Sequence, residues 1–261
     1  MNEWAELSNA RIWYRVSGSG EPVVLLHGGL TDSRDFDGNL AALSSSFRVF
    51  MPEHRGHGHS PDVDGPLSIE VMADDMVEFI HKIVGTASHV VGYSAGASVA
   101  LYSALKRREL IRSLVAISGA LGRDGWLVRP QDGEPPGPLL RAYAEVSPDG
   151  ADHFRTVIAK AAAAATEIGR PITDLARLDL PVLVIVGDDD FVDLRHAIDV
   201  YESLPDAALA VLPNASHLLL HEHSETITRL VAHFLTNGHS PTLLPIRRRS
   251  RGKKLRPRES V

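Results

Sequence analysis

Short, continuous runs of apolar residues recur along this chain, and each is bounded by glycine, proline or polar residues. Runs of this length with many β-branched members are typical of strands that are buried on both faces. They lie at residues 22–26, 48–52, 89–93, 114–118, 181–186 and 208–212. A looser alternation over residues 3–16, followed by turn residues at 17–20, predicts an antiparallel hairpin at the start of the chain.

Helical patterns separate these runs. Apolar residues at the spacing of one helix face occur after the second run, at Met72, Met76, Phe79, Ile80 and Ile83. Residues 95–106 are small and apolar and predict a buried helix, and residues 195–204 and 225–235 predict two more. Continuous apolar strands that alternate with helices predict an α/β fold with a mostly parallel sheet covered on both faces.

The alternation stops between residues 119 and 178. A proline-rich loop at 129–138 is followed by stretches at 139–146 and 154–168 that predict helices. Because this segment is inserted between two core strands, we expect residues 119–178 to form a small helical cap over the site; a long surface excursion is the alternative. The core would then comprise residues 1–118 and 179–237.

Composition limits the chemistry and the compartment. The chain of 261 residues has no cysteine, which excludes disulfides, thiolate metal sites and a cysteine nucleophile. The first residues show no basic region followed by an apolar stretch, and no apolar run approaches the roughly 18 residues of a membrane span. We therefore expect a cytoplasmic protein without a membrane span.

Charge is distributed unevenly. Residues 247–261 contain eight of the 27 basic residues and one acid, so this segment carries a net charge of +7 and residues 1–246 carry −13. Because the segment has too few apolar residues to fold around, we expect residues 238–261 to form a basic disordered tail. A basic tail can bind nucleic acid or anionic lipid, but nothing in residues 1–246 indicates nucleic-acid recognition, and we expect no such partner.

Residues 92–96 read Gly-Tyr-Ser-Ala-Gly and match Gly-x-Ser-x-Gly between a predicted strand and a predicted helix. A sharp strand-to-helix turn projects its central residue outward and requires glycine on both sides, because a Cβ there would collide with the adjoining strand or helix. This context predicts that Ser94 is an activated nucleophile. A serine nucleophile needs a base, a group that orients the base, and donors for the oxyanion that forms.

Three other stretches that directly follow predicted strands supply these groups, as the sheet geometry requires. Residues 187–193 contain four aspartates and supply the acid, and residues 213–217 end in His217, the predicted base. Residues 27–29 read His-Gly-Gly and offer a loop for one oxyanion donor, and the backbone amide of Ala95 would be the second.

In these features the chain resembles the α/β-hydrolase superfamily, and specifically its cap-bearing esterase, perhydrolase and C–C hydrolase branch. The resemblance covers about residues 8–236 and rests on five motifs in the family's order: a strand into His-Gly-x, Arg-Gly-x-Gly-x-Ser at 55–60, Gly-x-Ser-x-Gly, Gly-x-x-Asp and a late Ala-Ser-His. It implies an α/β-hydrolase fold with an eight-stranded, mostly parallel sheet, helices on both faces and a small helical cap.

The resemblance also assigns residues. It maps the orienting acid to Asp190 and the first oxyanion donor to Gly29. One departure is Glu53, where many members have Asp at the head of the Arg-Gly loop. The other is the strongly acidic loop, in which three further carboxylates compete with Asp190: Asp188, Asp189 and Asp193.

The predicted activity is hydrolysis of a carboxylic ester or related small acyl compound through an acyl-enzyme, with no cofactor and no metal. C–C bond hydrolysis and cofactor-free perhydrolysis on the same triad stay open, as does a non-catalytic ligand receptor on this scaffold. The spacing of His54, His57 and His59 suggests a metal, but the resemblance places them in a structural turn. Candidate residues of the substrate pocket are Leu30, Tyr93, Trp126, Tyr143 and Phe154.

Overall fold

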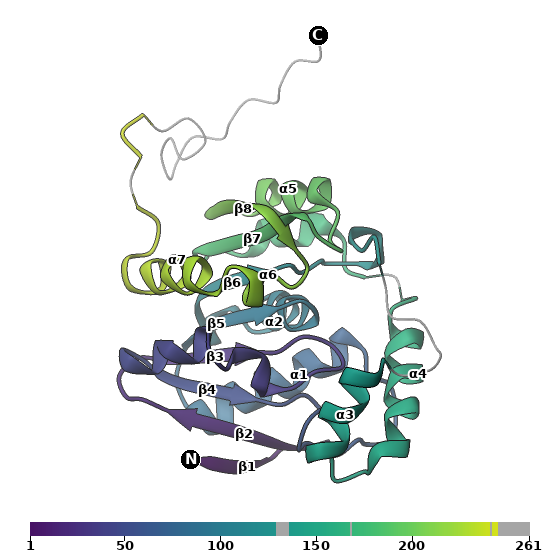
Figure 1. The fold of residues 1–261 in the computed structure, drawn as a ribbon. Coiled ribbons are helices and arrows are strands. Elements are labelled where there is room, and N and C mark those ends of the chain that lie inside the picture. Colours follow the sequence, from purple (N-terminus) through teal and green to yellow (C-terminus); the bar gives the residue numbers. More distant parts are fainter. Residues whose placement is uncertain (129–135, 168, 241, 245–261) are drawn as a thin grey trace.

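A single eight-stranded sheet forms the centre of the computed structural model, which describes residues 1–128, 136–167, 169–240 and 242–244 (Figure 1). Each apolar run of the sequence lies in one of its strands. The strands are β1 (Asn2–Glu6), β2 (Arg11–Ser17), β3 (Pro22–Leu26), β4 (Arg48–Pro52), β5 (Ser88–Tyr93), β6 (Ile111–Ile117), β7 (Val182–Asp189) and β8 (Ala207–Ser216).

The strand order is β1-β2-β4-β3-β5-β6-β7-β8. β1 and β2 form the predicted antiparallel hairpin, and β2 pairs antiparallel with β4. All pairs from β4 to β8 are parallel, which confirms the prediction of a mostly parallel sheet. The carboxyl ends of the parallel strands therefore lie along one edge, where ligands bind in folds of this kind.

Helices accompany the strands along the described part of the chain. The α-helices are α1 (Ile69–Phe79), α2 (Ala95–Lys106), α3 (Gly137–Val146), α4 (Phe154–Ala164), α5 (Leu194–Ser203), α6 (Leu219–Glu222) and α7 (Ser224–Asn237). A π-helical turn continues α1, and shorter 3-10 turns lie at Ser33–Phe36, Leu40–Ser45, Arg108–Leu110, Arg123–Gly125, Ala151–His153 and Ile172–Arg177. No helix among the described residues combines the length and apolar character needed to cross a bilayer.

Two hydrophobic cores cover the two faces of the sheet, because successive side chains of each strand point to opposite faces. In β3, Val24 and Leu26 pack into one core together with α1, α2 and α5. Val23 and Leu25 pack into the other core together with α7 and the 3-10 turn around Phe36. Figure 1 shows these helices on both sides of the sheet. Burial on both faces explains why the strands appear in the sequence as continuous apolar runs.

α3 and α4 lie in the inserted segment between β6 and β7. They pack on each other through the rings of Tyr143 and Phe154, whose centroids are 4.5 Å apart, and this small cluster also includes Leu67 of the core. α4 ends four residues before the predicted limit, because both the amide and the hydroxyl of Thr166 donate to the carbonyl oxygen of Ala163. These two helices are the α-helices among the described residues of the predicted cap segment.

Two further predictions fall partly outside the described residues. The proline-rich loop is described only from residue 136 onward, and of the predicted tail at 238–261 only residues 238–240 and 242–244 are described. The cap as a separate unit over residues 119–178 and the basic tail therefore stay predictions.

A buried ion pair connects the loop after β4 to α1. Arg55 Nε and Nη2 donate to Asp75 Oδ2 and Oδ1, each at 2.6 Å, and both side chains are about 95% buried. The planar guanidinium matches a carboxylate in this bidentate geometry. The pair holds the Arg-Gly-x-Gly loop against the first helix.

Asp75→Asn is expected to lower the free energy of unfolding by about 3 kcal/mol, because the buried charge of Arg55 loses its partner. Urea denaturation followed by circular dichroism measures this change. The matched control is Asp74→Asn, since Asp74 lies next to Asp75 on α1 and is 64% exposed; it should change stability by less than about 1 kcal/mol. Equal losses in the two variants would contradict a structural role for the buried pair.

Candidate active site

The turn at Ser94 joins β5 directly to α2. Ser94 has φ 55° and ψ −121°, a backbone conformation that residues other than glycine rarely adopt. A Cβ on Gly92 would lie 2.2 Å from the carbonyl oxygen of Gly96, and one on Gly96 would lie 2.1 Å from that of Leu26. Both glycines are thus required by close backbone contacts, and the partly exposed Ser94 side chain projects from the turn.

Ser94, His217 and Asp190 lie in one hydrogen-bonded chain. Ser94 Oγ is 2.9 Å from His217 Nε2, and His217 Nδ1 is 2.7 Å from Asp190 Oδ1. The three residues come from the ends of β5, β8 and β7. The structure therefore brings together the nucleophile, base and acid that the sequence predicts.

The carboxylate of Asp190 is fully buried and accepts hydrogen bonds on both oxygens. Besides His217, the donors are the hydroxyl of Ser118 and the backbone amides of Gly187 and Val192. Burial alone would raise the pKa of Asp190, but the hydrogen bonds from His217 and Ser118 outweigh it and hold the pKa below its ordinary value. The group therefore stays ionised and fixed in orientation beside the imidazole.

The other carboxylates of the acidic loop have different positions. Asp188 Oδ1 accepts a hydrogen bond from the amide of Ala215, and Asp193 caps α5 by accepting from the amide of Arg195. Asp189 is exposed at the end of β7. Of the four aspartates in this loop, Asp190 is the one that contacts His217.

Aromatic residues surround the imidazole of His217. The ring of Phe191 stacks on it with a centroid distance of 4.7 Å, and the ring of Trp126 lies edge-on at 6.0 Å. Tyr93 is buried below the site, and its hydroxyl donates to the carbonyl oxygen of His217 at 2.7 Å. Tyr93 and Phe191 thus fix the position of the histidine from two sides.

The two backbone amides predicted as oxyanion donors, those of Gly29 and Ala95, belong to neighbouring segments. A Cβ on Gly29 would lie 3.5 Å from Ala95 Cβ, so the loop after β3 touches the first residue of α2. The first amides of a helix have no partner within the helix. Within the described part of the chain neither the Gly29 nor the Ala95 amide donates a hydrogen bond.

Positive φ angles concentrate at this edge of the sheet. The non-glycine residues with φ between 50° and 62° in the described chain are Leu30, Ser94, Ser118 and Asn214. Two of them directly follow β5 and β6, and Asn214 lies three residues before His217. Strained backbone of this kind concentrates at sites where a fixed geometry is needed.

The candidate pocket residues take different positions. Leu30 and Tyr143 line a cavity of about 190 Å³ beside the site. Phe154 is buried behind Tyr143, and Trp126 lies near His217. Tyr93 packs in the core between the sheet and α7, and it contacts His217 both through its hydroxyl and through its ring, whose centroid lies 5.6 Å from that of the imidazole.

The histidines of the turn after β4 are buried among one another. His27 Nε2 accepts from the amide of His54 at 3.0 Å, and the rings of His54 and His57 lie 4.6 and 5.5 Å from that of His27. Burial lowers the pKa of His57 to about 4 and that of His54 well below its ordinary value. Among the residues with described placement, no group of three or more His, Asp or Glu side chains is arranged to hold a metal ion.

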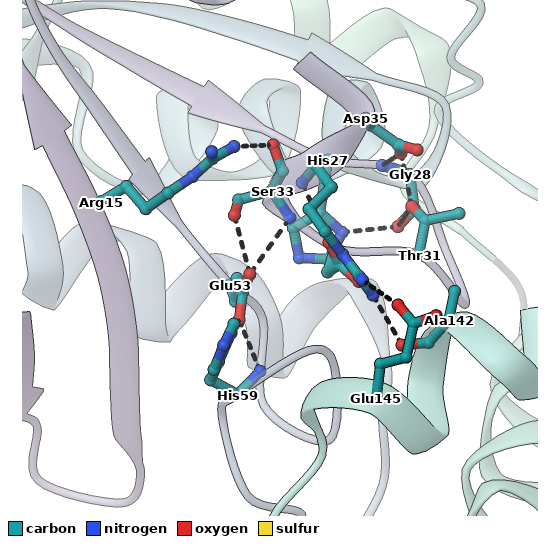
Figure 2. Close-up of polar contacts among 12 residues, drawn as sticks. Arg15, His27, Gly28, Thr31, Ser33, Asp35, Glu53, His59, Ala142 and Glu145 are labelled. Carbon is teal, nitrogen blue, oxygen red and sulfur yellow. Dashed lines mark hydrogen bonds and ion pairs between the residues drawn. The ribbon is translucent and has the colours of Figure 1, made fainter. Parts of the chain in front are cut away.

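Glu53 is completely buried beneath the same loop. Its Oε1 accepts from the hydroxyl and amide of Ser33, and its Oε2 accepts from the amide of His59, as Figure 2 shows. The longer side chain that replaces the family's Asp therefore links the loop after β3 to the loop after β4.

Sequence reasoning missed Ser118 and Phe191. Ser118 directly follows β6, so the strand-end rule that found the other site residues could have found it too. Phe191 lies directly after Asp190, but no motif marks it, because its contact with His217 depends on how the loop turns.

Comparisons with known proteins agree with this geometry. Residues 23–230 match the sequence model of the Alpha/beta hydrolase family. A 2-hydroxy-6-oxononadienedioate/2-hydroxy-6-oxononatrienedioate hydrolase of Comamonas testosteroni is 25% identical over 89% of this chain and 93% of its own. A pimeloyl-[acyl-carrier protein] methyl ester esterase of Aeromonas hydrophila is 25% identical over 84% of this chain and 96% of its own.

Solved structures share the fold. The enol-lactonase from Burkholderia xenovorans has a TM-score of 0.75 and 23% identity, and the match covers 90% of this chain and all of the lactonase. The match to the family's sequence model covers most of the chain, and it decides the family. The chain belongs to the α/β-hydrolase family.

Proposed function

We propose that this chain is a serine hydrolase of carboxylic esters or related acyl compounds. The observation that carries the proposal is the hydrogen-bonded chain from Ser94 Oγ through His217 to the buried carboxylate of Asp190. A serine beside a base, with the base oriented by a third group, is the arrangement that activates a hydroxyl for attack on a carbonyl carbon.

In the acylation step, His217 Nε2 takes the proton of Ser94 as Oγ attacks the carbonyl carbon. The amides of Gly29 and Ala95 would donate to the oxyanion of the tetrahedral intermediate. Asp190 steadies the imidazolium, which then gives its proton to the departing alcohol. Water attacks the acyl-enzyme by the same route, with His217 again as the base, and releases the acid and free Ser94.

A second candidate reaction is C–C bond hydrolysis. The support for it is the Comamonas testosteroni relative, which matches over most of both chains. Its name denotes a hydrolase of unsaturated 2-hydroxy-6-oxo dioates. The Aeromonas hydrophila relative, at the same identity, supports the ester reaction. Ester hydrolysis remains the first proposal because it needs no group beyond the triad and the two amides.

Ser94→Ala should lower kcat for p-nitrophenyl butanoate by about 10⁴-fold or more, because the nucleophile is lost. Ester turnover is followed by the release of p-nitrophenolate. The control is Ser103→Ala, since Ser103 lies on the same helix and is buried away from the site; it should retain turnover. Undiminished turnover in Ser94→Ala would end the proposal.

The wild-type protein distinguishes ester hydrolysis from C–C hydrolysis and from ligand binding without turnover. Assays with 2-hydroxy-6-oxo-6-phenylhexa-2,4-dienoate, the compound named for a Burkholderia cepacia relative, measure C–C cleavage. Faster cleavage of this compound than of any short ester would favour the C–C reaction. A wild-type protein whose Ser94 is labelled by a fluorophosphonate but which turns over neither compound would favour a ligand receptor.

Asp190→Asn should lower kcat by about 10⁴-fold, because an amide no longer favours the histidine tautomer that presents Nε2 as a base. Asp189→Asn is the matched control on the exposed neighbour and should leave kcat within about twofold of the wild type. Steady-state kinetics with p-nitrophenyl butanoate measures both variants. A reversed order of the two effects would show that Asp189 is the orienting acid.

The pH dependence follows from the same groups. Turnover should fall in acid with the slope of one proton, because a protonated imidazole at His217 cannot accept the Ser94 proton. Asp190 adds no second proton in this range, since its pKa lies below the ordinary value. Its contribution to stability is present above about pH 4 and is lost as the pH falls through the native pKa. A two-proton slope in kcat/KM between pH 5 and 7 (roughly the histidine range) would contradict this assignment.

A further inference from the structure

The cavity beside the site lies between the loop after β3, α3 and α6. Its walls are residues 30–32, 34 and 35 of that loop, Gly58, three residues of α3 (Leu139, Ala142 and Tyr143), and His221. Its volume of about 190 Å³ is below the roughly 300–1,000 Å³ of pockets that hold drug-sized ligands. A space of this size suits a short acyl chain.

The cavity wall is close to the nucleophile. An ideal Cβ built on Gly28 lies 3.5 Å from Ser94 Cβ and 3.5 Å from Asp35 Oδ2. Ser94 Cβ and Asp35 Oδ2 are therefore no more than 7.0 Å apart. The next residue along this loop, Gly29, carries the proposed oxyanion amide, so the loop that forms this wall also borders the place where an acyl group would be bonded to Ser94.

The arginine of the cavity wall is already occupied. Arg34 donates to both carboxylate oxygens of Asp32, to the carboxylate of Glu145 at 2.7 Å, and to the carbonyl oxygen of Ala142 at 2.6 Å. Figure 2 shows Ala142 and Glu145 converging on this point from α3. These contacts use all but one of the five N–H groups of a guanidinium, and the two carboxylates outnumber the single positive charge.

Asp35 forms no ion pair with the described residues, and the basic group that lowers the pKa of its carboxyl, by less than burial raises it, is the buried His27. Its Oδ2 accepts hydrogen bonds from the hydroxyl of Thr31 at 2.5 Å and the amide of Gly28 at 3.4 Å, and its Oδ1 accepts none within the described chain (Figure 2). Burial raises the pKa of the Asp35 carboxyl. The wall nearest to Ser94 thus carries a carboxyl group without a balancing charge.

We propose that this cavity holds the acyl group of the substrate and selects short acyl chains that are uncharged or cationic, with Asp35 as the residue that excludes chains ending in a carboxylate. The inference rests on the proposed hydrolase function and adds its substrate class. A substrate carboxylate would meet Asp35 and the Asp32–Arg34–Glu145 cluster, in which carboxylates outnumber the arginine, with His221 as the remaining basic side chain of the wall. This excess of carboxylates disfavours its burial.

Three p-nitrophenyl esters of matched length test the selection at pH 8, where ionisation of Asp35 is favoured. They are the butanoate, the hemisuccinate, which carries a carboxylate in place of the terminal methyl group, and the 3-aminopropanoate, which carries an amine there. In the wild type, kcat/KM for the hemisuccinate should lie on the order of 10- to 50-fold below that for the butanoate, because two carboxylates would share one small cavity and repel each other. The 3-aminopropanoate should be cleaved at least as well as the butanoate.

Asp35→Asn should lower the ratio of kcat/KM for the butanoate to kcat/KM for the hemisuccinate about fivefold or more. The asparagine side chain keeps the size of the aspartate and removes its charge. Asp37→Asn is the matched control: Asp37 lies two residues further along the loop, is 54% exposed and pairs with Arg15, and its variant should keep the wild-type ratio. Thermal melting shows whether each variant is folded. Equal turnover of the two esters by the wild type, or an unchanged ratio in folded Asp35→Asn, would overturn the inference.

A binding measurement separates this inference from the hydrolase proposal. Calorimetry compares butanamide with succinamate, which are not readily hydrolysed, on the wild-type chain. Stronger binding of butanamide supports the selection even where no ester is cleaved, and in that case the hydrolase proposal alone fails. Binding of succinamate as tight as that of butanamide, or no binding of butanamide, would overturn the inference.

Discussion

The close approach of α2 to β3 at Gly96 is the contact on which the site depends. A Cβ at this position would lie 2.1 Å from the carbonyl oxygen of Leu26, so the helix can pass β3 this closely only without a side chain there. The approach places the first amides of α2 against the loop that follows β3. Ser94 and the amides of Ala95 and Gly29 are therefore held by one rigid junction of two strands and a helix.

The buried carboxylates near this junction, Asp190 and Glu53, each accept several hydrogen bonds. Asp190 accepts from two side chains and two backbone amides, and Glu53 accepts from Ser33 and His59 below the loop. Buried carboxylates with several donors have fixed orientations and cost little to desolvate further. The strained backbone at Ser94 and Ser118 persists because these contacts over-determine it. A site built in this way has its polar groups in place before a substrate binds.

The strands, the helix after Ser94 and the positions of Ser94 and His217 could be predicted because they depend on local patterns and on the rule that sites follow strand ends. The choice of Asp190 required the family resemblance, since four aspartates share one loop. Asp190 is distinguished from the other three by its hydrogen bond to His217, and the spacing of residues along the chain does not reveal that contact. The extension of β8 to Ser216 was also missed, because its polar residues look like a loop. Ser216 pairs with Asp189 after a shift in register, and Gly187 leaves room there for the backbone of Ala215.

The charge of the cavity bears on which reaction this scaffold performs. The Comamonas testosteroni relative is named for dioates, which carry two carboxylates, whereas the Aeromonas hydrophila relative is named for a methyl ester. A wall that contains Asp35 and an arginine already bound by Asp32 and Glu145 carries more carboxylates than arginines, which disfavours a substrate carboxylate. Since the fold and the triad serve both reactions, these few side chains in the loop after β3 are the feature that favours a neutral acyl substrate. Under the proposed function, this loop would select the acyl group of the substrate, while the triad would carry out the steps that the two reactions share.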